Sequence, residues 1–395
     1  MPHEWNRIRK THCELGAPTV IAASGESASS LAAQFAMCND FTMRKNDADV
    51  PAWQLRELSD FDALSRWLGR APESHLSSDT ALALATRAYW HGLHSETVPR
   101  GPCTGVGCVG PFADGQNRQN APRHRAYVAV QTSECTRLWS INDRSRPPVG
   151  SDPGSVTCEL VKLVLAQAAG IEIETDIDPT GDHSLEYREH RAASLLVDLL
   201  THRRQIAWSL PGNTLSGREP ATTAAVLSGS FNPLHSGHLS LLAAAEKQLG
   251  GSVCFEMSVL NAEKAPLDYL SINDRCRQFR SHPVALTCAP TFAEKSVFFP
   301  GKTFVIGVDT AQRIVSPRFY DGQAERMHEA IAQIRAAGCR FLVAGRLASG
   351  KFQRLADVSI PAGFESLFGE LTEQEFREDI SSTHHRAGQV PGSDS

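Results

Sequence analysis

The chain has 395 residues, of which 41% are hydrophobic and 21% charged, a balance typical of a globular protein with two domains. Its formal net charge of -5 and the lack of a Lys/Arg block argue against nucleic acid as a partner. No apolar run reaches transmembrane length, and the N-terminus, MPHEWNRIRK, lacks the apolar region of a signal peptide, so we expect no membrane partner. The ten cysteines form no CxxC pair, which is typical of reduced thiols in a cytoplasmic protein.

The N-terminal half alternates apolar runs with segments of helical periodicity. Strands are predicted at 18–23, 126–131 and 135–141, and helices at 55–68, 80–92, 156–169 and 186–204. Ser77, Ser78 and Asp79 predict a capped start for the helix at 80–92, because their side chains accept hydrogen bonds from the first helical N–H groups. A Gly-rich segment, GPCTGVGCVG, has the character of a strand and a turn.

Three parts of this half resemble the C-terminal amidohydrolase domain of the CinA family, which includes nicotinamide mononucleotide deamidases. They are IAASGES, SSDTALALATRA, and TGVGCVGP followed by RAYVAV. The resemblance implies an α/β domain over residues 14–209, with Ser24 at the position of the family's nucleophile.

The resemblance to the CinA family is weakest at the positions that would carry out catalysis. The family's turn reads Ser-Cys-Thr-Gly-Gly, and this chain has Ser-Gly-Glu-Ser-Ala. The Tyr-Ser-x-x-x-Lys segment that would supply a base is not found, and Lys45 lies in a polar stretch without that context. Since a serine needs an adjacent base to become a nucleophile, we expect no deamidase activity. Without that activity, the domain would serve packing, regulation or the assembly of a homo-oligomer.

The segment 210–223, LPGNTLSGREPATT, is rich in Pro, Gly, Ser and Thr and is predicted to be a linker. After it comes AAVLSGSFNPLHSGH, Ala224–His238. Its apolar start predicts a buried strand, and LSLLAAAEKQLG predicts a helix with Pro233 near its first turn. Such a strand, turn and helix direct backbone N–H groups and the helix dipole at an anion, usually a phosphate. His235 and His238, three residues apart, would share one helix face.

Further strands are predicted at 253–260, 284–287, 303–308 and 340–344, alternating with helices. This alternation predicts a doubly wound, Rossmann-like parallel sheet. Lys264 follows the strand at 253–260, at the carboxyl edge where ligands gather in such sheets. The segment SINDRCRQF predicts a helix that is capped by Ser271 and carries Arg275.

The segment GSFNPLHSGH resembles the signature of the nucleotidylyltransferase superfamily, a His-x-Gly-His after a strand. Near the C-terminus, ISSTHHR is similar to an ISSTxxR motif, and together they look most like the nicotinamide mononucleotide adenylyltransferases. The resemblance implies a nucleotidylyltransferase domain over 224–387, a disordered tail at 388–395, and catalysis by His235 and His238. The nucleotide-binding residues that it implies are Ser228, Gly229, Ser230, Phe231, Asn232, Gly237, Lys264, Asp309, Ser381, Ser382, Thr383 and Arg386.

An enzyme of this family would transfer AMP from ATP to nicotinamide or nicotinate mononucleotide, giving NAD and pyrophosphate. Catalysis would consist of positioning two anions and neutralising the charge that builds on phosphoryl oxygens. The expected partners are ATP, a mononucleotide, and Mg²⁺ brought with ATP, which needs few protein ligands. Two alternatives stay open: a cytidylyl- or adenylyltransferase acting on another phosphomonoester, and a non-catalytic scaffold that binds nucleotide.

Overall fold

The computed structural model describes residues 2–14, 18–36, 53–94, 103–110, 125–143, 153–168, 170–174, 183–220, 223–260, 265–348 and 351–377. The chain divides into two compact units. The first comprises Met1–Ala192 and Glu263–Ser271, and the second comprises Ala193–Ala262 and Ile272–Ser395.

The first unit is a three-layer α/β structure. Its helices are α1 (Pro2–Glu14), α2 (Glu26–Ala36), α3 (Phe61–Leu68), α4 (Ser78–His94) and α5 (Pro153–Ala168). Its strands are β1 (Thr19–Ser24), β2 (Trp53–Leu58), β3 (Thr104–Val109), β4 (Arg125–Gln131), β5 (Cys135–Asp143) and β6 (His183–Arg191). The sheet has the order β2-β1-β3-β4-β5-β6, parallel around β1 and antiparallel from β3 onward.

Both faces of this sheet are covered by helices. Val20 and Ala22 of β1 pack with α3 and α4, and Ile21 and Ala23 pack with α1, α2 and α5. The central residues of a strand that is buried on both faces are mostly apolar, which explains the run Val20–Ala23 that predicted it.

The Gly-rich segment allows α4 to pack closely on β3. A Cβ on Gly105 would lie 2.1 Å from the carbonyl oxygen of Ala85, and one on Gly107 would lie 2.2 Å from that of Ala81. The backbone of α4 therefore lies directly against β3, and any larger residue at these two positions would separate them. These two glycines serve the packing of a helix on a sheet.

Five predictions in this unit are confirmed, namely the strands at 18–23, 126–131 and 135–141, the helix at 80–92, and the helix at 156–169 as far as the described residues extend. Two predicted helices are partly wrong. Within 55–68, the residues up to Leu58 belong to β2, and α3 starts only at Phe61, where Asp60 accepts a hydrogen bond from the Ala63 N–H at 2.7 Å. Within 186–204, the first residues belong to β6, and α6 (Ser194–Leu200) is short. In both segments the spacing of apolar residues is compatible with a helix or a strand. Hydrogen bonding to a neighbouring strand of the sheet determines that they are strands.

The second unit is built on an eight-stranded sheet. Its strands are β7 (Ile206–Leu210), β8 (Thr214–Ser216), β9 (Ala225–Ser228), β10 (Val253–Ser258), β11 (Val284–Thr287), β12 (Thr303–Gly307), β13 (Arg340–Ala344) and β16 (Phe368–Leu371). A separate hairpin pairs β14 (Arg346–Ala348) with β15 (Lys351–Gln353). The helical elements are α6, α7 (Ser236–Leu249), α8 (Tyr269–Cys276), α9 (Phe292–Phe298), α10 (Val308–Ile314), α11 (Ala324–Ala336), η1 (Pro317–Tyr320), η2 (Leu355–Asp357) and η3 (Glu365–Leu367).

The strand order is β16-β13-β12-β9-β10-β11-β7-β8, and the six strands from β16 to β11 are parallel. Numbered along the chain, β11-β10-β9-β12-β13-β16 is the order 3-2-1-4-5-6 of doubly wound nucleotide-binding folds. The chain passes from one side of β9 to the other between β11 and β12. The topological switch point therefore lies where β9 and β12 end.

The stretch predicted as a linker, 210–223, differs from the structure. Residues from Ile206 to Ser216 form the β7–β8 hairpin, which adds antiparallel strands to the sheet edge beside β11. Gly212 and Asn213 in its turn have φ angles of 83° and 61°. Pro211 and Gly212, which contributed to the linker prediction, thus lie with Asn213 in a tight turn. The second unit begins at Ala193, before the predicted boundary.

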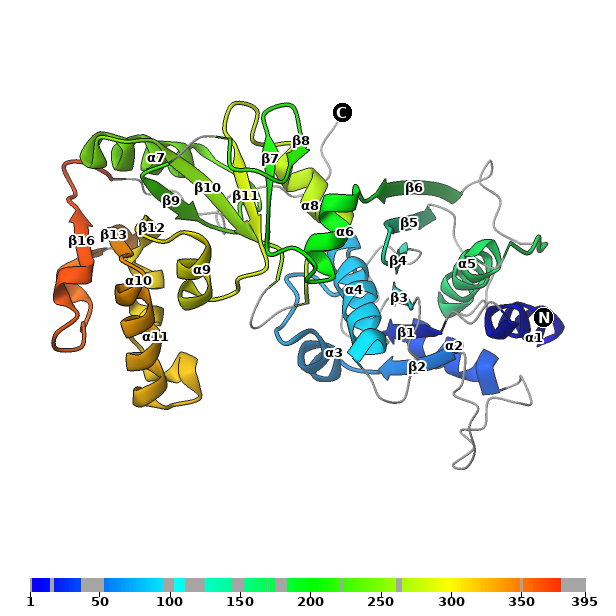
Figure 1. Ribbon diagram of the computed structural model, residues 1–395. Helices are drawn as coiled ribbons and strands as arrows, with labels where there is room; N and C mark the ends of the chain where they lie inside the picture. The colour runs from blue at the N-terminus through cyan, green and yellow to red at the C-terminus, as the bar shows by residue number, and fades with distance from the viewer. Residues whose placement is uncertain are drawn as a thin grey trace, which may run out of the picture. The chain divides into compact units, whose positions relative to one another are not determined.

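Helices cover both faces of this sheet. A core forms between Phe304 and Phe341 of the sheet and three residues of the helical layer: Phe299 directly after α9, Ile314 of α10 and Ile331 of α11. Figure 1 shows α7 on the opposite face of the sheet. Across the described parts of the chain, none of the helices combines the length and apolar character needed to cross a membrane.

Candidate functional site

The strand, turn and helix that the sequence singled out lie at the switch point of the second unit. β9 ends at Ser228, residues 229–235 form the turn, and α7 begins at Ser236 with His235 as its N-cap. Pro233 lies in this turn, before the helix, and so not in the helix's first turn as expected. Gly237 is buried in the first turn of α7, and Asn232 is half-buried ahead of it. The exposed N–H groups of a helix start are thereby presented at the sheet edge where this fold binds ligands.

The two histidines form one structural unit. Their rings stack with centroids 3.7 Å apart and an interplanar angle of 28°. His238 Nδ1 accepts a hydrogen bond from the His235 N–H at 3.2 Å, and the His238 N–H donates to the His235 carbonyl oxygen at 3.0 Å. Because Nδ1 is an acceptor here, the neutral His238 ring carries its proton on Nε2. The pair is half-buried and presents an N–H donor held in place by the start of the helix.

The buried side chain of Phe231 packs against the ring of His238. Its side chain is 1% exposed and meets the rings of His238, Phe255 and Phe279 edge to face, with centroids 5.0–5.2 Å away. Its φ of 44° is uncommon for a residue other than glycine and stores local strain. A Cβ on Gly229 would lie 2.7 Å from the Phe231 ring, so glycine is required there. We therefore assign Phe231 and Gly229 to the packing that orients the histidines.

Two side chains from α8 and the residues after it hold the turn. The Gln278 side chain donates to the Phe231 carbonyl oxygen at 3.3 Å and accepts from the Leu234 N–H at 2.7 Å. Arg275 Nη1 donates to the carbonyl oxygen of Ser230 at 3.1 Å. Arg275 was predicted to lie on this helix, but the bonds to the turn were not predicted. A glutamine just after a helix carries no sequence signal for them, because they depend on how the end of α8 packs against the turn.

Asp309 and Arg346 lie at the ends of neighbouring strands. Asp309 is in the first turn of α10 after β12, and Arg346 follows β13. Arg346 Nη1 and Asp309 Oδ2 are 2.7 Å apart, and both side chains are about half exposed. Since β12 pairs with β9, this accessible charge pair belongs to the same carboxyl edge as the histidine turn.

Residues 226–388 match the family model described as cytidylyltransferase-like. The second unit therefore carries a cytidylyltransferase-like domain, of the nucleotidylyltransferase superfamily. The match starts in β9, so the β7–β8 hairpin and α6 precede it. The family supports a nucleotidyltransferase activity in general. The comparison with curated proteins found no match to the chain.

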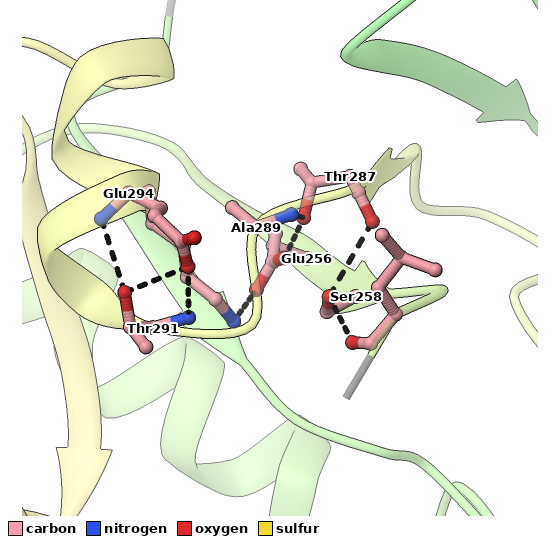
Figure 2. Close-up of polar contacts among 8 residues, drawn as sticks. Glu256, Ser258, Thr287, Ala289, Thr291 and Glu294 are labelled. Carbon is pink, nitrogen blue, oxygen red and sulfur yellow. Dashed lines mark hydrogen bonds and ion pairs between the residues drawn. The ribbon is translucent and has the colours of Figure 1, made fainter. Parts of the chain in front are cut away.

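A buried polar network joins β10, β11 and α9 of the cytidylyltransferase-like domain (Figure 2). Glu256 of β10 is fully buried, and its carboxylate accepts hydrogen bonds from Thr287 Oγ1 and from Lys295 Nζ, both at 2.6 Å. The Glu256 carbonyl oxygen accepts from the Gly229 N–H at 3.0 Å. Thus the carboxylate that anchors α9 belongs to the residue whose backbone positions the start of the turn. Sequence reasoning missed this pair, although a Glu inside the apolar strand VCFEMS was a visible signal.

Ser228 is the neighbour of Glu256 across the β9–β10 register. Its Oγ is buried and meets no hydrogen-bond partner in the residues that the structure covers. A hydroxyl so placed at the end of β9 is available to a ligand at the switch point.

Five expected nucleotide-binding residues lie outside the described residues: Lys264, Ser381, Ser382, Thr383 and Arg386. The expected tail at 388–395 and Lys45 also fall there. The structure brings together His235, His238, Ser228, Gly229, Ser230, Phe231, Asn232 and Gly237 in one turn and the elements that flank it, and it places Asp309 at the same edge of the sheet.

Ser24 in the first unit occupies a comparable position. It ends β1 and is fully buried, and its Oγ forms no hydrogen bond with the described part of the protein. Ser27 and Thr157 nearby also have buried hydroxyls without partners there, and Ser27 Oγ would lie 2.3 Å from a Cβ on Gly110. Among the described residues, Ser24 thus forms no hydrogen bond to a lysine or histidine that could act as its base.

Proposed function

We propose that the cytidylyltransferase-like domain transfers AMP from ATP to nicotinamide mononucleotide or nicotinate mononucleotide and releases pyrophosphate. The observation that carries the proposal is the stacked histidine pair at the start of α7, in which His238 presents an Nε2–H donor. The choice of acceptor rests on the sequence segments GSFNPLHSGH and ISSTHHR, which look most like the mononucleotide adenylyltransferases.

In this reaction an acceptor phosphate oxygen attacks the α-phosphorus of ATP. The bond from that phosphorus to the bridging oxygen breaks, and pyrophosphate leaves with the electron pair. Negative charge builds on the α-phosphoryl oxygens during the step. An N–H donor held rigidly beside a helix N-terminus stabilises that charge without reorganising. His238, kept in one tautomer by the His235 N–H, fits this role.

Binding the phosphates of ATP before the reaction requires groups other than the two histidines. The N–H groups at the start of α7 suit a phosphate, and Ser228 Oγ lies at the end of β9. Arg386, in the segment ISSTHHR, is proposed to bind the leaving pyrophosphate in bidentate fashion. Mg²⁺ is proposed to arrive bound to the triphosphate, where it would supply charge neutralisation and need few protein ligands.

The decisive experiment measures pyrophosphate release by the purified full chain with ATP and Mg²⁺, across a panel of phosphomonoester acceptors. We expect turnover with nicotinamide or nicotinate mononucleotide, and CTP in place of ATP tests the nucleotide. Turnover only with another acceptor, such as phosphopantetheine, choline phosphate or glycerol phosphate, would assign the domain to another branch. Nucleotide binding without turnover on any acceptor would indicate a non-catalytic scaffold.

A further inference from the structure

One side chain, that of Gln278, holds the backbone of the histidine turn at two points. Its amide nitrogen donates to the Phe231 carbonyl oxygen at 3.3 Å, and its amide oxygen accepts from the Leu234 N–H at 2.7 Å. Gln278 and the turn belong to the same compact unit, the second. A single planar group thus fixes both ends of the short segment that leads directly into His235.

These bonds also determine which backbone groups the turn presents to a ligand. The carbonyl oxygen of Ser230 is paired with the Arg275 guanidinium at 3.1 Å, and that of Phe231 is paired with Gln278. A free carbonyl oxygen repels a phosphate, whereas the N–H groups and the positive end of a helix attract it. Pairing these two carbonyl oxygens with donors therefore reduces the repulsion of an anion at the start of α7.

Gln278 is itself oriented by its neighbours. Its amide nitrogen lies 3.5 Å from the Asp274 carbonyl oxygen, to which it also donates, and its backbone N–H donates to the Arg275 carbonyl oxygen at 3.2 Å. The next residue, Phe279, is buried, and its ring meets that of Phe231 edge to face at 5.2 Å. Phe231 is thus held through its backbone by Gln278 and through its ring by Phe279.

The β7–β8 hairpin supports the segment that carries Gln278. Asn213, in the turn of the hairpin, donates from Nδ2 to Oδ1 of Asn273 on α8 at 2.9 Å. Its own Oδ1 accepts from Ser209 Oγ of β7 at 3.4 Å. Asn273, Asn213 and Ser209 all lie in the second unit. The hairpin precedes residues 226–388, which match the family model, so this support comes from outside the matched segment.

We propose that Gln278 is a positioning residue for the histidine turn and that the β7–β8 hairpin supports it through Asn213. Gln278 acts through the backbone that precedes His235, and so on the place of the His238 ring. The hold on the backbone follows from hydrogen bonds within one unit, whereas its effect on the rate of nucleotidyl transfer rests on the proposed function. A small displacement of the His238 donor would weaken its stabilisation of the transition state.

The first test is amide hydrogen exchange of the full chain, resolved at Leu234. Gln278→Met removes the acceptor of the Leu234 N–H, and we expect exchange there to accelerate about fivefold to tenfold. Gln278→Glu keeps an oxygen that accepts from this N–H and should restore its protection. Asn213→Gly tolerates the φ of 61° at this position and removes only the amide. It should accelerate exchange at Leu234 about twofold to threefold.

A matched control separates this hold from a general loss of stability. Gln333 of α11 also donates its side-chain amide to a backbone carbonyl oxygen of the second unit, that of Ala293 at 3.0 Å. Gln333→Met should therefore leave exchange at Leu234 unchanged. Exchange in β12 reports the stability of the sheet and should be unchanged in Gln278→Met and Asn213→Gly.

The second test is steady-state kinetics. If the wild type turns over, Gln278→Met should lower kcat about tenfold and change KM for ATP less than about twofold, because the displaced His238 donor acts in the transition state. Gln333→Met should keep the kcat of the wild type.

The hold on the turn is refuted if Gln278→Met leaves exchange at Leu234 as in the wild type, or if Gln333→Met accelerates it equally. Unchanged exchange in Asn213→Gly would refute the support by the hairpin. Faster exchange with an unchanged kcat in Gln278→Met would refute the positioning role. Should no acceptor support turnover, the proposed function fails, and the exchange data still decide whether Gln278 holds the turn.

Discussion

The two units start their parallel sheets in the same way and diverge at the first turn. β1 and β9 are both buried strands with parallel neighbours on each side, and both end in a serine followed by a glycine. After Ser24, one residue separates the strand from α2. After Ser228, seven residues intervene and bring two histidines to the start of α7.

Both folds place a helix N-terminus at the edge of the sheet, and the residues of the turn before that helix determine which chemistry is possible there. In the first unit, Ser27 and Thr157 have buried hydroxyls near the Ser24 turn, and a hydroxyl can neither remove the Ser24 proton nor carry charge at neutral pH. In the second unit, two imidazole rings stack where the turn meets α7, and Arg275 donates to the Ser230 carbonyl oxygen within the turn. The Gly229 N–H donates to the backbone of Glu256, whose buried carboxylate pairs with Lys295. Four predictions test this contrast, in order of decreasing effect.

The largest effect is expected from the buried charges. Lys295→Met leaves the fully buried Glu256 without its partner and should destabilise the second unit by about 3–5 kcal/mol. Lys162→Met in the first unit removes a lysine that is also buried, but its partners Glu4 and Glu159 keep 30% and 27% exposure, so the loss should be about 1 kcal/mol. Urea unfolding followed by hydrogen exchange in each unit measures both. Equal losses of stability in Lys295→Met and Lys162→Met would contradict the difference expected between the two units.

The second prediction concerns catalysis. His238→Ala removes the proposed donor to the α-phosphoryl oxygen and should lower kcat by about 10²–10³, with KM for ATP within a few-fold. Arg386→Ala should instead raise KM for ATP, because its proposed partner, the triphosphate, is present in the ground state. His328→Ala, on α11 beside Phe364, is the control and should keep full activity. Steady-state kinetics of the three variants make the measurement. An unchanged kcat in His238→Ala would show that the histidine turn is not the catalytic centre.

The third prediction tests the packing below His238. Gly229→Ala places a methyl group 2.7 Å from the buried Phe231 ring and should cost about 1–3 kcal/mol of stability, together with a lower kcat. At Gly307, a Cβ would meet no atom within 4 Å, so Gly307→Ala is the matched control. Thermal unfolding and kinetics of both variants are compared, and similar behaviour of the two would show that Phe231 adapts freely.

The smallest effect is a pH dependence of the first unit. Burial lowers the pKa of His12, although its hydrogen bond to the Leu165 carbonyl oxygen opposes the shift. The folded state therefore holds this ring neutral, and the unfolded chain binds its proton first as pH falls below about 6.5. Stability is thus complete above that pH and declines below it, by at most about 1.4 kcal/mol per pH unit.

His12→Gln should remove this slope, because its amide can still donate to Leu165 and does not titrate in this range. Hydrogen exchange in α1 and α5 at pH 5 to 8 makes the measurement. An equally steep slope in the variant would assign the pH dependence to other groups.

Several features of the fold could be predicted because local chemistry is enough to specify them. The apolar runs of β1 and β9 exist because both faces of each strand are covered, and the Ser77 side chain caps α4 as its position indicates. The histidine pair was visible because a spacing of three residues at a helix start places two rings together wherever the helix lies. The cap of α8 was wrong: Ser271 lies inside the helix, and Asp268 caps it.

The amino-acid sequence by itself determined the strand, the turn and the helix around Ser228 and His238, and through them the family of the second unit, because those features depend on neighbours in the chain. Only the tertiary structure decided that Trp53–Leu58 is a strand, that residues 206–216 form a sheet hairpin, and that Gln278 holds the histidine turn. It also paired Glu256 with Lys295, 39 residues apart. In each case the deciding partner is distant in sequence, and its hydrogen bond or ion pair exists only once the sheet has assembled.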